Sequence, residues 1–381
     1  MFYVSKVSPL FFILALLNIF TSLLLKVSGS EGIPFYILIV FGFLGSTLVG
    51  AMYQIIPNSQ SRKPPLSFVS YVVFALSGLA SPLFWIGSYT IASVLIFLAY
   101  GTFFFHTLAS VKNWTPPTVK FLGASTLYLF LSSFLLMLSM SFGYVSLQAA
   151  VHTLTVGALL NAVYGVEIAW IPMLLMSALS FRSMKRLFLA KQASTAVVVL
   201  AFMSMHYHVI ALASLLELGV SLYYLYMNYS LLKNRNAPSP VPYVVRMFLV
   251  ALLFLPLGII VGGALASHPR VIPYLLDLHI DLLVYGFAAF TIFGGMFHLL
   301  PRIIWNWKFA SSREAPTIGE LVDEKAFPRF LVVSVIFLLL FIAMDLMPET
   351  LGRYSAFVYA VIILFFVKIS FFHVINKLRG A

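Results

Sequence analysis

The stretch HIDLLVYGFAAFTIFGGMFHLLPR, from His279 to Arg302, sets the architecture of this chain. It is apolar over enough length to cross a bilayer, which takes about 20 residues of helix. On a helical projection Gly286, Gly294 and Pro301 fall on the same face as His279. A face of small residues lets a flat or bulky group lie close to the helix, and a histidine at its edge is the usual ligand for such a group. The stretch therefore predicts a membrane helix that carries a ligand site.

The same spacing of two glycines and a proline occurs three times, with the glycines fifteen and seven residues before the proline. The three sets are Gly42, Gly50 and Pro57; Gly157, Gly165 and Pro172; and Gly286, Gly294 and Pro301. The copies begin 115 and 129 residues apart, which leaves room for four membrane helices in each. We expect a single membrane domain over residues 1–381, made of repeats at about 1–115, 116–240 and 241–381.

Composition gives the class of protein. Of the 381 residues, 62% are hydrophobic and only 9% are charged, and the mean hydropathy is +1.03, as in polytopic membrane proteins and not in soluble domains. The chain has no cysteine. This excludes disulfides, cysteine-ligated iron-sulfur clusters, covalently attached c-type haem and thiolate copper centres.

Hydropathy predicts about twelve membrane spans. They are residues 8–28, 33–57, 66–87, 89–111, 117–140, 144–174, 187–206, 209–233, 242–266, 271–301, 327–347 and 352–375. The expected fold class is an all-α polytopic membrane protein with these helices in three pseudo-repeated four-helix arcs.

Basic residues predict the orientation, because they concentrate in cytoplasmic loops. Twenty of the 23 lysines and arginines, Lys191 among them, are expected on the side that holds both termini, and only Lys26, Arg270 and Arg353 on the other. Both termini are therefore predicted to be cytoplasmic. The formal charge of +12 is attributed mostly to these basic residues, which contact anionic membrane lipids, and not to a nucleic-acid-binding surface.

Four histidines are predicted to share one level of the membrane. His152 and His279 fall near the outer ends of the sixth and tenth spans, and His206 and His208 at the outer junction of the seventh and eighth. Neutral imidazoles in a low-dielectric layer need partners, and a metal satisfies them well. A metal or haem site is the favoured interpretation. The alternative for each histidine taken singly is a hydrogen-bonded packing residue.

These stretches resemble the catalytic subunit of the haem-copper oxidase superfamily, most closely the C-type oxidases and nitric oxide reductases. IVFGFLGSTLVGAMYQ (Ile39–Gln54) is similar to their helix 2, and His279 and Asp281 stand before Pro301-Arg302 where that family has His-x-His. His152 lies twenty residues before Pro172 as in their helix 6, and Met205-His206-Tyr207-His208 matches their histidine pair. HTLTVGALLNAVYG, from His152, is also similar to short twelve-helix haem-copper proteins of the bacterial nitric-oxide stress response.

The resemblance implies specific ligands. His279 would be the axial ligand of a high-spin haem, and His152, His206 and His208 would hold copper facing it. Val156 stands where the reductases have a glutamate, which favours copper over non-haem iron. Phe35 and Asp281 replace both ligands of the family's low-spin haem, so we expect one haem, of b type because no cysteine can attach it.

Further residues can be given roles, each with a structural alternative. Tyr207 is expected as a proton donor and Glu217 as the group that delivers protons to the site; a buried glutamate can equally be an interhelical hydrogen bond. Arg353 and Arg270 are expected to clamp haem propionates. Their alternative is snorkelling at the membrane surface.

The resemblance thus implies an oxidoreductase of the nitric oxide or oxygen reductase type in a bacterial or archaeal inner (cytoplasmic) membrane, supplied by an external electron donor. Its oligomeric state is left open, a homo-oligomer included. Two alternatives stand beside this. One is a haem-based gas binder or sensor without turnover, and the other is a non-redox twelve-helix transporter.

Overall fold

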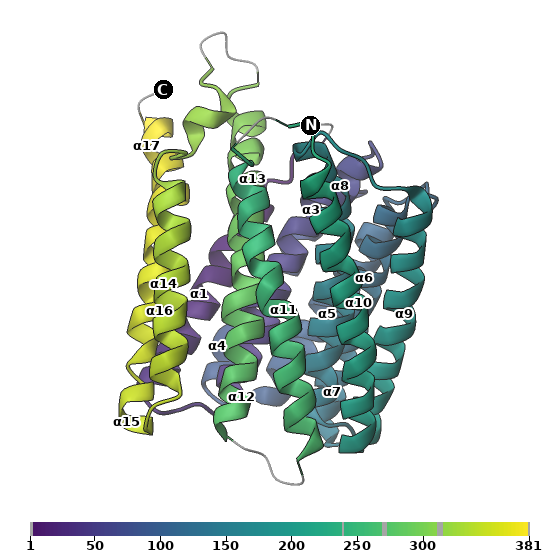
Figure 1. The fold of residues 1–381 in the computed structure, drawn as a ribbon, viewed down its shortest axis with the longest axis vertical. Coiled ribbons are helices and arrows are strands. Elements are labelled where there is room, and N and C mark those ends of the chain that lie inside the picture. The colour runs from purple at the N-terminus through teal and green to yellow at the C-terminus, as the bar shows by residue number, and fades with distance from the viewer. Residues whose placement is uncertain (1–2, 238–239, 269–272, 311–314, 380–381) are drawn as a thin grey trace.

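The structure is a computed structural model that describes residues 3–237, 240–268, 273–310 and 315–379. Within these ranges the regular structure is helical throughout, and the helices run side by side along one axis (Figure 1). Eleven of the described helices are long and apolar enough to cross a membrane, and α4 (Val69–Trp85) is a shorter apolar helix. The expected all-α polytopic membrane fold with about twelve helices is confirmed.

Four of the described spans include a π-helical stretch; the last span has it near its end, and the other three have it near their start. These three are α2 (Ile33–Ile37), η1 (Leu38–Gly45) and α3 (Ser46–Ser59); α7 (Leu147–His152), η2 (Thr153–Leu159) and α8 (Leu160–Leu174); and α12 (Pro273–Ile280), η3 (Asp281–Ala288) and α13 (Ala289–Lys308). In the most apolar windows of these spans 89%, 72% and 83% of residues are buried, against 28% for α14 (Phe327–Asp345). These three spans therefore form the centre of the bundle.

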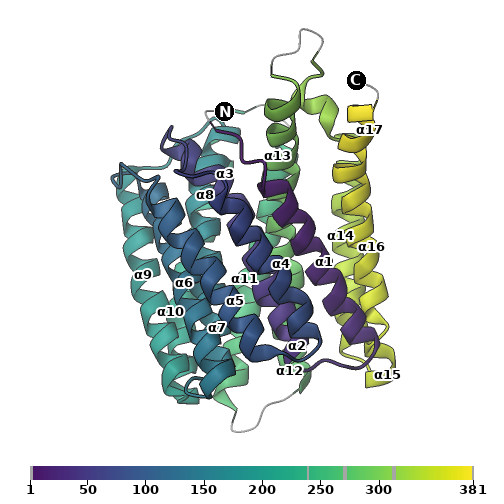
Figure 2. The same cartoon turned by 180° about the vertical axis from the view of Figure 1, so that it is seen from behind.

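The other elements surround this centre. They are α1 (Ser8–Val27), α5 (Tyr89–Leu108), α6 (Pro117–Phe142), α9 (Phe181–Ser204), α10 (Tyr207–Lys233), α11 (Tyr243–Ser267), the short η4 (Ile318–Leu321) and α15 (Glu349–Gly352), and the last span, α16 (Ser355–Val367), η5 (Lys368–Phe372) and α17 (His373–Arg379). Figure 2 shows from behind that both termini lie at one end of the bundle, while α2, α7 and α12 lie toward the other. Which end faces the cytoplasm stays a prediction.

The three copies of the glycine and proline pattern pack in the same way. The π-helical stretches begin at Leu38, Thr153 and Asp281, which is 19, 19 and 20 residues before the proline of each copy. In each copy the first glycine is pressed against the preceding span: a Cβ would lie 2.7 Å from Asn18 at Gly42, 2.7 Å from Tyr128 at Gly157 and 2.9 Å from Phe254 at Gly286. The spacing in the sequence thus reflects a repeated close contact between helices.

The seventh span begins earlier than predicted. Ser180 caps α9, its hydroxyl accepting a hydrogen bond of 3.1 Å from the Ser183 N–H, so that the helix starts at Phe181 and not at 187. Lys191 consequently lies well inside the helix and is fully buried. The sequence placed Lys191 on the side that holds both termini and did not predict its burial.

Candidate functional site

Two of the four predicted histidines face one another. His152 ends α7 and His279 lies one residue before the end of α12, so each stands directly ahead of a π-helical stretch of a central span. Their ring centres are 6.3 Å apart and their planes differ by 24°. The two ligand candidates that the sequence placed on different spans therefore meet at the end of the bundle opposite the termini.

The hydrogen bonds of these imidazoles fix their tautomers. Nδ1 of His152 lies 2.8 Å from the carbonyl oxygen of Gln148, and Nδ1 of His279 lies 2.9 Å from that of Gly258. A carbonyl can only accept, so Nδ1 carries the proton in both rings and Nε2 keeps its lone pair. Among the described residues neither Nε2 has a hydrogen-bond partner. Donation of one ring N–H to a backbone carbonyl is typical of histidines that bind a metal through the other nitrogen.

Neighbouring helices hold both rings in place. The Phe202 ring from α9 stacks on His152 with centres 3.6 Å apart and planes 13° apart. Gly262 of α11 lies under His279, where a Cβ would come within 2.5 Å of ring atom Cε1. A larger residue at position 262 would therefore displace the imidazole. The orientation of each ring is set by tertiary packing, which gives a preformed site.

The turn between α9 and α10 carries the other two histidines. Met205 has a left-handed backbone (φ 53°) that ends α9, and His206, Tyr207 and His208 are exposed. Nδ1 of His206 bonds to the carbonyl of Ser204 at 2.8 Å. Within the described ranges no group of three or more His, Cys, Asp or Glu side chains is arranged to hold a metal ion. The structure thus brings His152 and His279 together and does not gather His206 and His208 with them.

Glu217 is buried in an ion pair. Only 3% exposed, it accepts a hydrogen bond of 2.5 Å from Nζ of Lys191 and one of 2.6 Å from the Ser194 hydroxyl. An isolated charge is costly in a membrane, and the pairing accounts for both charged groups. The ion pair was missed because it joins two helices, α9 and α10, and no local pattern in the sequence reports such a contact.

Of the two predicted propionate ligands, only Arg353 lies within the described residues. The Arg353 guanidinium packs against Gly29, where a Cβ would lie 2.6 Å from Cζ, in the connection after α1. Arg270 is outside the described residues. Lys26, the third cation expected at this end, is paired with Asp345 at 2.7 Å and with Glu31 at 3.2 Å.

The positions that correspond to the family's low-spin haem ligands are both buried. Asp281 is 2% exposed and interacts electrostatically with Asp345 and Lys26. Phe35 is 3% exposed and packs edge-on against Tyr36. Neither side chain is an imidazole. The prediction of one haem therefore depends on the replacement of both histidine ligands by Phe35 and Asp281.

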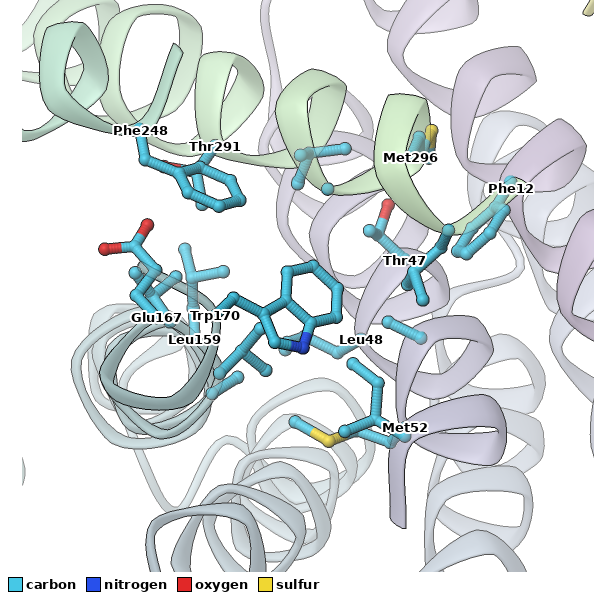
Figure 3. A pocket seen from close by; sticks show the side chains of 18 residues that line it. Phe12, Thr47, Leu48, Met52, Leu159, Glu167, Trp170, Phe248, Thr291 and Met296 are labelled. Carbon is cyan, nitrogen blue, oxygen red and sulfur yellow. The ribbon is translucent and has the colours of Figure 1, made fainter. Parts of the chain in front are cut away.

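A central cavity of about 80 Å³ lies among α3, α8 and α13 (Figure 3). Its wall is largely apolar, and the Glu167 carboxyl points toward Phe248 and Thr291 in that view. The Tyr224 hydroxyl donates to Oε2 of Glu167 at 2.7 Å, while Glu167 Oε1 and the Thr291 hydroxyl have no partner among the described residues. The cavity is formed by three spans that are distant in the sequence, and no local pattern predicts it.

Comparison with known proteins gives one relative and no family description. No family model matches the chain. An uncharacterized protein of Aquifex aeolicus (strain VF5) is 52% identical over 370 residues, which is 97% of each chain. Its name states no activity, so the chemistry must be argued from the histidine pair.

Proposed function

The chain belongs to the same family as the uncharacterized Aquifex aeolicus protein, and we propose that it is a multi-pass membrane protein that holds one b-type haem on His279 and binds or reduces a diatomic gas, nitric oxide or oxygen. The observation that carries the proposal is the state of the His279 ring. Its Nδ1–H is donated to Gly258, its Nε2 is unpartnered, and it faces a second imidazole in the same state.

The residues fit an axial haem ligand at His279. A proximal histidine needs a free Nε2, a fixed ring orientation and a basicity raised by a hydrogen bond at Nδ1. His279 meets all three through Gly258 and Gly262. The absence of cysteine from the chain fits a non-covalent haem. Haem iron would supply an open coordination position for the gas and a centre that accepts and gives single electrons.

The residues do not fit the expected copper in the described arrangement. Three imidazoles were expected to hold it, and of these only His152 faces the haem ligand, while His206 and His208 lie exposed on the turn after α9. Copper at these three residues, expected from the resemblance, would need His206 and His208 to move toward His152, and the present proposal does not include it. We assign no step to it.

Protein groups around the pair have defined tasks in this proposal. Phe202 and Gly262 orient the two rings, and the apolar surroundings keep bulk water from the bound gas. Both carboxylate oxygens of Glu217 are engaged, by Lys191 and by the Ser194 hydroxyl, and the proton delivery expected of this residue stays a prediction. Tyr207 is exposed at the start of α10, and its role as a proton donor stays a prediction. Electrons must arrive from an external donor, because the chain offers no cysteine-bound centre of its own.

An absorption spectrum of the purified protein, with iron analysis, tests the proposal. We expect a Soret band, a haem extractable without covalent attachment, and about one iron per chain. Binding of carbon monoxide or nitric oxide to the reduced protein should shift the band. Consumption of nitric oxide or oxygen with an artificial reductant separates an enzyme from a gas binder or sensor. A protein expressed with haem available that shows no Soret band would refute the proposal.

The central cavity supports a second candidate, a transporter. Transporter sites form near the midplane, where internal repeats meet and helices depart from regular α geometry. The cavity lies among the second spans of the three predicted repeats, mainly in the helices that follow their π-helical stretches, and carries an unpartnered oxygen of Glu167. A protein without haem that moves a solute across vesicles, and loses this in Glu167→Ala, would favour the transporter.

A further inference from the structure

We propose that His152 and His279 bind the same haem iron from its two faces, so that the resting haem is six-coordinate and a gas binds only when His152 leaves. This inference rests on the proposed function, since it presupposes the haem on His279. It departs from the arrangement expected from the resemblance, in which His152 serves a separate copper ion.

The distance between the rings decides between one metal and two. A metal–imidazole bond is about 2.0–2.1 Å, so two imidazoles on opposite sides of one ion have ring centres roughly 6 Å apart. Two ions about 3.5–4 Å apart would add that separation and give roughly 10 Å. The observed distance is 6.3 Å. It matches one shared metal and is several ångströms too short for two.

The hydrogen bonds leave each ring one nitrogen that can bind a metal. Nδ1 of each ring is engaged by a carbonyl, of Gln148 and of Gly258, and this leaves one unpartnered Nε2 on each histidine. Their planes differ by only 24°, an angle that two imidazoles across one haem can adopt without strain. In the described residues no third His, Cys, Asp or Glu joins them to form a metal cluster. Two nitrogen donors and no more are what an iron already held by four porphyrin nitrogens requires.

The repeat explains why the pair is symmetric. His152 and His279 occupy nearly equivalent places, twenty and twenty-two residues before the prolines of the second and third copies. Each stands just ahead of the wide π-helical turn of its span, a feature often found at functional sites. In the first copy the corresponding residues are Ile37 and Phe35, which cannot bind a metal. Two repeats thus supply one ligand each, and the third supplies none.

A consequence is that the haem is protected from its gas ligand. When only a fraction of the protein molecules can bind the gas, the apparent affinity is the intrinsic affinity multiplied by that fraction. If His152 is bound in about nine chains of ten, its removal raises the apparent gas affinity about tenfold. His152 is held by Phe202 on one face, so its departure needs movement of that contact between α7 and α9.

The experiment is magnetic resonance and absorption spectroscopy of the oxidised haem protein, in the intact chain and in His152→Ala. The intact protein should show the low-spin signature of two axial imidazoles. His152→Ala should become high-spin, bind carbon monoxide about tenfold more tightly when reduced, and regain the low-spin spectrum when free imidazole is added. His206→Ala/His208→Ala is the matched control and should keep the low-spin spectrum.

The outcomes separate this inference from the proposed function. Haem that is high-spin in the intact protein, with about one copper per chain, would overturn the shared ligation and leave the haem on His279. A low-spin spectrum that survives in His152→Ala would also overturn it. The spectrum of the intact protein decides the matter if the variant fails to fold. The absence of any haem would remove both proposals.

Discussion

The pair His152 and His279 and the pair His206 and His208 lie at the same end of the bundle, yet their surroundings differ. The first pair is partly buried on central spans, and neighbouring helices orient both rings. The second is exposed on the turn between two peripheral helices. Depth in the membrane can be read from hydropathy, but the direction in which a side chain faces depends on how the helices pack. Only the first pair has the features of a metal site.

The largest effect is expected from His279→Ala. Loss of the proposed axial ligand should abolish stoichiometric haem, with a fall in haem per chain of more than about tenfold, since even residues that support a ligand change metal affinity about 10–100-fold. Haem content measured from the absorption spectrum checks this. His208→Ala, at the same end of the bundle, is the control. Equal haem loss in both would remove the distinction between the two histidine pairs.

Lys191→Met should cost stability without changing the haem spectrum. It leaves Glu217 as an uncompensated buried charge, which typically costs about 3–5 kcal/mol. The double variant Lys191→Met/Glu217→Met should recover most of that loss, because both charges are removed together. Thermal unfolding in detergent measures the stability. A single variant as stable as the parent protein would contradict the buried ion pair.

Gly262→Ala should weaken the haem site more gently. The added Cβ would lie within 2.5 Å of the His279 ring and push it away from the Gly258 carbonyl. Changes in the residues that orient a metal ligand typically lower the affinity for the metal about 10–100-fold. Haem titration of the two apo proteins measures the change. Gly219→Ala on α10, where a Cβ meets nothing within 4 Å, is the control and should bind like the parent; a Gly262→Ala protein that does so too would contradict the packing.

The smallest effect is expected from His206→Ala and His208→Ala. Exposed substitutions usually change stability by no more than about 0.5 kcal/mol, and the structure gives these residues no shared partner with His152. Haem content, copper content and unfolding temperature should all stay near those of the parent protein. Loss of a bound copper in either variant would show that the turn rearranges to complete the three-histidine site.

Much of the fold follows from local sequence. Runs of apolar residues predicted the spans, and the repeated glycine spacing corresponds to glycines pressed against the preceding helix at Gly42, Gly157 and Gly286. The start of α9 was wrong because the cap at Ser180 begins a helix whose first turns are polar. Basic residues in those turns resemble a loop when neighbours in space are unknown.

The candidate site was predictable in part. His152 and His279 were two of the four histidines that hydropathy placed at one level of the membrane, and the structure brings these two together. The exposure of His206 could not be foreseen, since it depends on the left-handed residue Met205 that turns the chain after α9. The pairing of Lys191 with Glu217 joins residues 26 positions apart on different helices, and no local pattern reports such a contact.

The central claim, that His279 holds a single non-covalent haem opposite His152, is tested most directly by measuring iron, copper and haem per chain in the purified protein. The account predicts about one iron, one extractable b-type haem and no stoichiometric copper. A preparation made with haem available that contains no iron, or that contains two haems for each chain, would contradict it.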